Sequence, residues 1–170
     1  MNQTMLLTSF DIWLPSHNSN SADDLLLEVS RHKSLPYDLI FLRRLPVDVA
    51  VASCRVIEKI HELQPHSVIC CGMAEKRTQL TVEVGASYAG NVLQTRVDLD
   101  QLVGSRAEIE ISHDCGKFVC EGLYYSVLDY LRQHKPRIYC IFVHVPILTV
   151  ENLPLILEDF LFIIHRLSLW

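Results

Sequence analysis

The chain has 170 residues and a formal net charge of -5, from 15 Lys and Arg against 20 Asp and Glu. This length is typical of one domain, so we expect a single domain over residues 1–170. With 49% hydrophobic and 21% charged residues, the composition is that of a globular protein and excludes wholesale disorder. The weak acidity disfavours nucleic acid as a main partner, and no stretch holds the roughly 18 unbroken apolar residues that a membrane span needs.

The first part of the chain alternates apolar runs with amphipathic ones. Apolar positions at spacings of three or four predict helices, and short continuous apolar runs predict buried strands. Two acidic residues just after Ser21 suit the positive end of a helix dipole. Strands are predicted over Met5–Phe10, Tyr37–Leu42 and Ser67–Cys71, and helices from Ser21 to about Lys33 and between Pro46 and Pro65.

The second part is less regular at first and then returns to the same alternation. Strands are predicted over Leu80–Val84, Ala107–Ile111 and Arg137–Val145, with a glycine-containing loop between the first two. Helices are predicted from Val119, where apolar residues recur every four positions, and from about Glu151 to the end. Alternating apolar strands and amphipathic helices predict an α/β protein, a three-layer α/β/α sandwich whose sheet is covered on both faces.

Six cysteines stand at positions 54, 70, 71, 115, 120 and 140. No basic residue flanks the apolar N-terminal run, so we expect no signal peptide and a reducing, cytoplasmic environment in which the thiols stay free. The spacing is poor for zinc, because there is no C-x-x-C pair and only His113, Cys115 and Cys120 come close together. The six residues are therefore buried structural cysteines or include a reactive one.

Three side chains at element ends have the chemistry of a catalytic site. Cys120 falls in the first turn of a predicted helix, where free N–H groups and the dipole favour a thiolate. His144 ends a predicted strand and is placed to act as a base, and Glu83 ends another and is placed to orient an imidazole. Each also has a structural interpretation, as a buried core cysteine, a hydrogen-bonded histidine and an exposed carboxylate. Sequence proximity does not decide between these interpretations.

Three motifs in chain order resemble the pyroglutamyl-peptidase I family of cysteine peptidases. Leu80–Glu83 is similar to the family's Leu-(Ser/Thr)-x-Glu, and Gly116–Cys120 fits its Gly-x-(Phe/Tyr)-x-Cys run. Cys140–Pro146 is similar to the family's strand ending in His, and the 24-residue step from Cys120 to His144 also suits the family. Near the N-terminus, Thr8–Trp13 looks like the family's substrate-pocket loop.

The resemblance implies a mixed, mostly parallel sheet and a peptidase that removes N-terminal pyroglutamyl residues without metal or cofactor. Cys120 would be the nucleophile, His144 the base and Glu83 the acid that orients the imidazole. The expected substrates are N-terminal pyroglutamyl peptides or small amides, with no nucleic acid or membrane as partner. Phe10, Trp13 and Met73 are the expected substrate-binding residues, and Gly116 and Lys117 the expected oxyanion turn.

The sequence also departs from the family. Val84 and Ser87 replace a cation and an asparagine, Glu121 follows the cysteine, and only 37 residues separate Glu83 from Cys120. A carboxylate beside the nucleophile would raise the thiol pKa, although it also suits a helix start. We therefore expect weaker hydrolysis than in longer relatives, because a shorter connection leaves the substrate less enclosed. An amide hydrolase of altered acyl specificity and a catalytically silent binding protein are the alternatives.

Two further expectations concern the surface. The C-terminal helix carries Phe160 and Phe162, with Trp170 at its end, which favours a second apolar face and a homo-oligomer. We also expect Cys120 to react with alkylating agents faster than the other cysteines, with Cys115, on a turn, as its one competitor.

Overall fold

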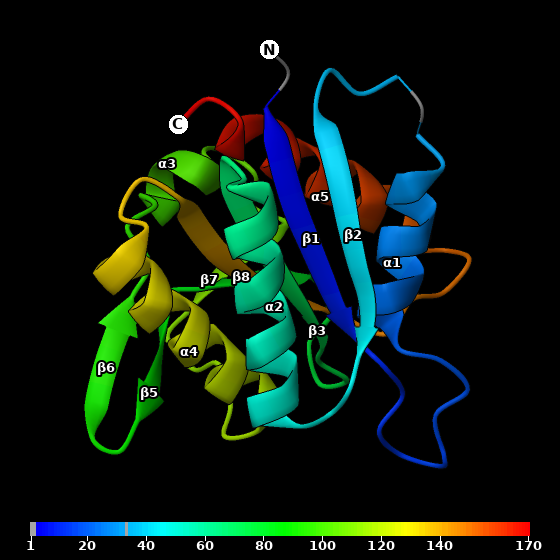
Figure 1. Cartoon of the computed structure of the whole chain (residues 1–170). Coiled ribbons are helices and arrows are strands. Elements are labelled where there is room, and N and C mark those ends of the chain that lie inside the picture. The colour runs from blue at the N-terminus through cyan, green and yellow to red at the C-terminus, as the bar shows by residue number, and fades with distance from the viewer. Residues whose placement is uncertain (1–2, 33) are drawn as a thin grey trace.

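The structure, a computed structural model, describes residues 3–32 and 34–170. It consists of a six-stranded sheet, a separate two-stranded hairpin and five helices, shown in Figure 1. The strands of the large sheet are β1 (Thr4–Phe10), β2 (Asp38–Leu45), β3 (Ser67–Met73), β4 (Leu80–Glu83), β7 (Ile109–Ser112) and β8 (Tyr139–Val145). The hairpin is β5 (Gly85–Tyr88) and β6 (Asn91–Gln94), and the helices are α1 (Ser21–Ser30), α2 (Val49–Leu63), α3 (Leu99–Val103), α4 (Val119–His134) and α5 (Leu153–Leu167).

The large sheet has the order β2-β1-β3-β8-β4-β7. Every neighbouring pair is parallel except β4 and β8, which are antiparallel. The predicted mixed, mostly parallel sheet is therefore confirmed. The central strands β1, β3 and β8 are buried along almost their whole length, which is why they read as continuous apolar runs rather than alternating ones.

Helices cover both faces of the sheet and form two separate hydrophobic cores. In Figure 1, α2 and α4 lie in front of the sheet and α5 lies behind it. Leu25, Phe160 and Ile163 belong to the core under α1, α3 and α5, whereas Ile60, Leu123 and Phe142 belong to the core under α2 and α4. The predicted α/β/α sandwich is confirmed, with the site residues on the α2–α4 side.

The sequence analysis missed two elements between β4 and β7. The β5–β6 hairpin turns at Ala89 and Gly90, both with positive φ, and its strands are only four residues long. The short helix α3 is capped by Asp98, whose side chain accepts a hydrogen bond from the Gln101 N–H. Elements this short bury too few apolar side chains to leave a periodic pattern.

Some predicted boundaries are wrong. The first helix ends at Ser30 rather than near Lys33, which itself lies outside the described residues. The strand predicted over Ala107–Ile111 begins two residues later and ends at Ser112.

The C-terminal helix does not present the aromatic face that the sequence suggested. Phe160 is fully buried, and Phe162 and Trp170 pack against the same core. Arg106 also lies over the Phe162 ring, 4.8 Å from its centroid. Phe160 is thus covered within the chain, whereas Phe162 and Trp170 are half-buried and expose less aromatic surface than the sequence suggested. No helix within the described residues combines the length and apolarity needed to cross a bilayer.

A buried ion pair fixes the loop that follows β1. Asp23 of α1 accepts hydrogen bonds from Ser9 Oγ (2.7 Å) and from Arg43 Nε and Nη2 of β2 (both 2.8 Å). Burial opposes ionisation of Asp23, but these hydrogen bonds outweigh it and hold the carboxyl pKa below its usual value. The pair joins α1 to β1 and β2 next to Phe10, which leads into the predicted substrate loop.

Candidate active site

Sheet register brings Glu83 and His144 together from strands far apart in the sequence. In the β4–β8 pairing, Glu83 stands opposite Phe142, so it faces the same side as His144 two residues further along β8. His144 Nδ1 lies 2.7 Å from Glu83 Oε1 in a buried hydrogen bond, and the Glu83 side chain is fully buried. The carboxylate therefore fixes the imidazole and leaves Nε2 as the ring nitrogen available for chemistry.

Gly72 explains how the thiol of Cys120 reaches the same place. Gly72 is the register partner of His144 on the neighbouring strand β3, so their side-chain directions share one face. A Cβ at Gly72 would lie 2.6 Å from Cys120 Sγ, so only glycine leaves room for the sulfur there. Cys120 and His144 consequently lie on the same side of the sheet. Within the described residues no hydrogen bond joins the Cys120 thiol to His144, although both side chains line one cavity.

One cavity of about 260 Å³ joins the thiol and the imidazole to the predicted substrate-binding residues. Phe10 is buried in its wall, while Trp13 is 44% exposed at the rim, where its ring lies 5.1 Å from that of Phe118. Met73 and Gly116 also line it, whereas Lys117 does not. The remaining lining residues are Asn20, Val47, Cys115 and Val119.

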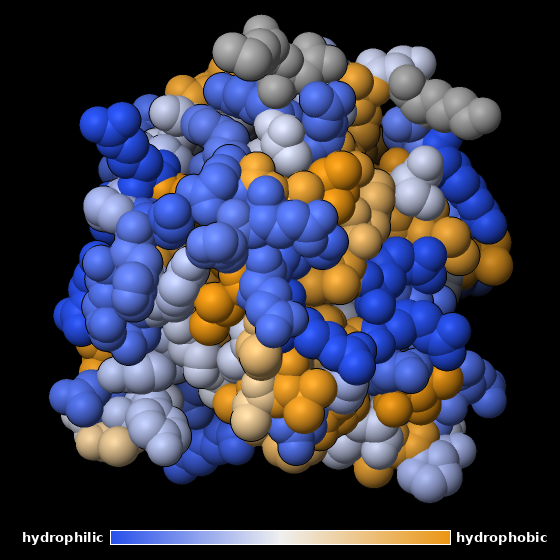
Figure 2. Space-filling view, viewed as in Figure 1, coloured by the Kyte–Doolittle hydropathy of each residue, from blue (hydrophilic) through white to orange (hydrophobic). Residues whose placement is uncertain are grey.

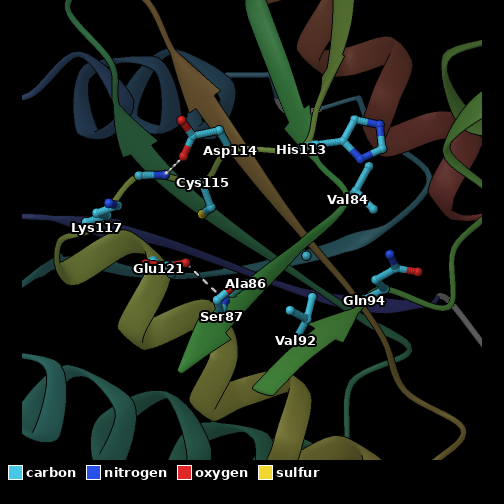
Figure 3. Close-up of a pocket in the computed structure, with 12 residues that line it drawn as sticks. Val84, Ala86, Ser87, Val92, Gln94, His113, Asp114, Cys115, Lys117 and Glu121 are labelled. Carbon is cyan, nitrogen blue, oxygen red and sulfur yellow. Dashed lines mark hydrogen bonds between the residues drawn. The ribbon is translucent and has the colours of Figure 1, made fainter. Parts of the chain in front are cut away.

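One N–H group of the turn expected to bind the oxyanion, at Gly116 and Lys117, already donates a hydrogen bond within the chain. The Gly116 N–H donates to Asp114 Oδ1 at 3.0 Å, as Figure 3 shows. The start of α4 offers other donors, because the first N–H groups of a helix have no intrahelical acceptor and Phe118 provides no side-chain cap.

A second cavity of about 420 Å³ lies next to the first and shares Cys115 and Gly116 with it. It is enclosed by the β5–β6 hairpin and the loop before α4 (Figure 3). Glu121 points across it and accepts a hydrogen bond from the Ser87 N–H at 3.0 Å. The carboxylate that follows Cys120 in sequence is therefore held at β5.

Burial raises the pKa of the Cys120 thiol to about 12, and the nearby Cys70 and Glu83 add to this effect. Of the two opposing effects expected at this helix start, desolvation thus outweighs the dipole and the local amides that favour a thiolate. The thiol is neutral at physiological pH and has to give up its proton to a base when it reacts.

Arg77 is a member of the site that the sequence analysis missed. From the β3–β4 connection its Nη2 lies 3.5 Å from Glu83 Oε1 and donates to Ser112 Oγ (3.2 Å) and to the Asp114 carbonyl (3.1 Å). Val84 removes one possible cationic partner of Glu83, and Arg77, six residues before the acid, provides another. No periodic pattern distinguishes Arg77 from the neighbouring Lys76 in this loop.

Asn20 was also missed, although it directly precedes the predicted helix start. Its Oδ1 accepts from the Ala22 N–H at 3.0 Å as the N-cap of α1, and its side chain lines the 260 Å³ cavity. The N-cap position is where asparagine is favoured, and that preference was the available signal. Among the described residues, no cluster of three or more His, Cys, Asp or Glu side chains is arranged to hold a metal ion.

All six cysteines are free, and their exposure changes the expected order of alkylation. Cys54 is exposed and Cys120 partly exposed, whereas Cys115, the predicted competitor, is buried with the other three. We expect iodoacetamide to label Cys54 first and Cys120 more slowly. Only the thiolate reacts, and the pKa of Cys120 is raised. Its labelling rate should therefore keep rising about tenfold per pH unit above about pH 8.5, where an ordinary thiol levels off.

Timed alkylation followed by peptide mass spectrometry measures these rates residue by residue. Labelling of Cys120 that levels off near about pH 9, or equal labelling of all six thiols, would contradict the structure.

A thiol beside an imidazole that is oriented by a buried carboxylate, in an α/β/α fold, is the arrangement typical of cysteine hydrolases. Comparison with solved structures identifies the fold as that of pyroglutamyl peptidase I. The Bacillus amyloliquefaciens enzyme superposes with a TM-score of 0.84 at 20% identity, covering 100% of this chain and 97% of that one. The pyrrolidone carboxyl peptidase of Thermococcus litoralis superposes with a TM-score of 0.80 at 17% identity, covering 98% and 93%.

Sequence comparison points the same way. A pyrrolidone-carboxylate peptidase of Thermoanaerobacter sp. (strain X514) is 28% identical over 125 residues, 58% of this chain and 62% of the relative. One from Bacillus mycoides is 28% identical over 173 residues, 86% of this chain and 79% of the relative. The chain thus spans about three-fifths of the first of these relatives, and no protein-family model matches it. The resemblance to the pyroglutamyl-peptidase I family is confirmed.

Proposed function

We propose that this protein is a cysteine peptidase that removes an N-terminal pyroglutamyl residue from peptides. The observation that carries the proposal is the hydrogen bond between Glu83 and His144, together with the cavity that His144 shares with Cys120. The names of the similar proteins support the same activity.

In the proposed mechanism His144 Nε2 takes the proton of the Cys120 thiol as the sulfur attacks the pyroglutamyl carbonyl. Free N–H groups at the start of α4 stabilise the oxyanion. The C–N bond then breaks, His144 returns the proton to the departing amine, and a thioester on Cys120 remains. Water, deprotonated by His144, hydrolyses the thioester and releases pyroglutamate. Glu83 holds the imidazole and stabilises its charged form throughout.

The chemistry of the cavity lining supports a pyroglutamyl group as the part of the substrate bound beside Cys120. Its lining is apolar and aromatic and includes no carboxylate, which suits a neutral lactam. A free N-terminal ammonium would be buried there without a charged partner, which is costly. The site is thus suited to a blocked, uncharged N-terminus.

The test is a matched pair of anilide substrates. Pyroglutamyl-anilide and prolyl-anilide both carry a five-membered ring, but only the prolyl ring has a protonated amine. We expect at least about a hundredfold preference for the pyroglutamyl compound in kcat/KM, because a lost charge partner costs several kcal/mol.

Comparable rates on both anilides would indicate an amide hydrolase of altered specificity. No turnover of any aminoacyl-anilide, with a Cys120 that is inert to iodoacetamide, would indicate a silent binding protein instead.

The short connection between Glu83 and Cys120 leads us to propose weaker activity than in longer relatives. With Arg77 present beside Glu83, this proposal rests on substrate enclosure alone. Equal kcat/KM for this protein and a longer relative, on the same substrate, would contradict it.

We further propose that the protein acts in the cytoplasm, because six free thiols suit a reducing compartment. A homo-oligomer also stays a proposal. Light scattering at micromolar concentration tests it, and the mass of a monomer would contradict it.

A further inference from the structure

A groove of about 890 Å³ runs along α4 between α2 and strand β5. Its walls carry partly exposed apolar and aromatic side chains together with the charged Lys117, Glu121 and Asp129. Figure 2 shows this face, with apolar surface among polar patches over α2 and α4. Val49 is 40%, Phe118 56% and Tyr88 66% exposed. We call this surface the α2–α4 groove.

The α2–α4 groove is continuous with the cavity that holds the thiol. Val47, Phe118 and Val119 line both, and Val119 directly precedes Cys120 in the first turn of α4. The hollow beside Cys120 and the groove therefore adjoin at Phe118.

The dimensions and chemistry of the groove suit an extended peptide. Helix α4 has 16 residues, so it is roughly 22 Å long, which is the span of about six residues in extended conformation. Two aromatic pairs stand along it, Tyr88 with Tyr125 (ring centroids 5.6 Å apart) and Tyr130 with His134 (4.9 Å). Such rings provide large apolar contact area together with polar groups for peptide amides.

The neighbouring polar cavity is the alternative path from Cys120. There the polar groups are already engaged with one another, since Glu121 accepts from the Ser87 N–H and Asp114 from the Gly116 N–H (Figure 3). Glu121 and Ser87 also line the α2–α4 groove. A peptide entering the polar cavity would in addition displace the Asp114 contact at Gly116, whereas the groove offers exposed apolar surface at Tyr88.

We propose that the α2–α4 groove binds the part of the substrate that follows the pyroglutamyl residue. This inference rests on the proposed function, whose substrate it specifies further. The preferred substrates are then pyroglutamyl peptides of about six residues with apolar or aromatic side chains after the second position.

Binding to the Cys120→Ala variant tests the groove separately from catalysis. Isothermal titration compares pyroglutamyl-alanine amide with a pyroglutamyl hexapeptide that carries leucine and phenylalanine beyond its second residue. We expect the hexapeptide to bind at least about tenfold more tightly, the effect of burying one large apolar side chain. A hexapeptide with glycine and serine at those positions should lose most of this advantage.

A second substitution in the same variant locates the contact. Tyr88→Ala removes a mostly exposed ring and should lower the affinity ratio of hexapeptide to amide toward one. Gln94→Ala, which alters the polar cavity instead, should leave that ratio unchanged.

Equal affinity for the two peptides, no binding of either, or a ratio sensitive to Gln94 and not to Tyr88 would each overturn the groove proposal. Turnover of pyroglutamyl-anilide by the unmodified protein tests the proposed function alone, so the two failures are distinguishable.

Discussion

Replacing Cys120 by alanine is expected to lower kcat for pyroglutamyl-anilide by at least about 10⁴-fold while leaving the protein folded. Without the sulfur no thioester forms, and His144 has no nucleophile to deprotonate. The thiol occupies a small space against Gly72, so its loss removes little packing and is expected to cost about 1 kcal/mol of stability. Initial rates and a urea unfolding curve measure the two effects.

Cys115→Ala is the matched control for this variant. Cys115 stands five residues earlier, lines the same cavity and is also a free thiol. Cys115 is buried and lies in the loop before α4, whereas Cys120 is partly exposed in the first turn of that helix. The Cys115 variant is therefore expected to stay within about tenfold of the parent rate. If the Cys120→Ala protein remains active, or the Cys115→Ala protein does not, Cys120 is not the nucleophile.

The second large effect is expected from Glu83→Gln, which should reduce kcat by about 10²- to 10⁴-fold. The amide keeps the shape of the carboxylate but not the charge that stabilises the imidazolium formed when His144 accepts the thiol proton. It also faces Arg77 with a weaker acceptor, so the 2.7 Å contact to His144 Nδ1 loses its fixed orientation. A urea unfolding curve of the variant distinguishes this loss of rate from a loss of folded protein.

Glu110→Gln provides the control, since Glu110 is the other carboxylate near Arg77, with Oε1 4.0 Å from Nη1. It is 52% exposed and lies outside the cavity, so the same chemical change there should leave kcat unchanged. A comparable loss of kcat in both variants would mean that the rate depends on the number of carboxylates beside Arg77 and not on the orientation of His144.

The sheet and its covering helices could be predicted because the relevant residues leave strong local patterns. The buried strand Ser67–Met73 appears as a continuous apolar run, and α4 as an apolar period of four from Val119 onward. The β5–β6 hairpin left no such pattern, because most of its eight strand residues are exposed. That the sheet is mixed came from the family resemblance, and the antiparallel pairing of β4 with β8 is known only from the structure.

The three residues with catalytic chemistry could be predicted from the sequence, but the residues around them could not. Cys120, His144 and Glu83 carry motif-level signals, but the role of Gly72 depends on a contact across the sheet that no local pattern encodes. The direction of the thiol pKa shift could not be predicted, because a helix start can be recognised in a sequence, whereas the burial of one sulfur atom cannot. Arg77 escaped notice for the same reason, since its partner Glu83 is defined only by the folded chain.

The most direct measurement is a search for the covalent intermediate. The protein is mixed with excess pyroglutamyl-anilide, quenched in acid within the first turnovers and digested, and the cysteine-containing peptides are compared by mass spectrometry. The proposed mechanism predicts the mass of one pyroglutamyl group on the peptide that contains Cys120, absent after treatment with hydroxylamine, which cleaves thioesters. Release of aniline with the group on Cys115, or rapid turnover with no acylated cysteine at all, would contradict the assignment of Cys120 as the nucleophile.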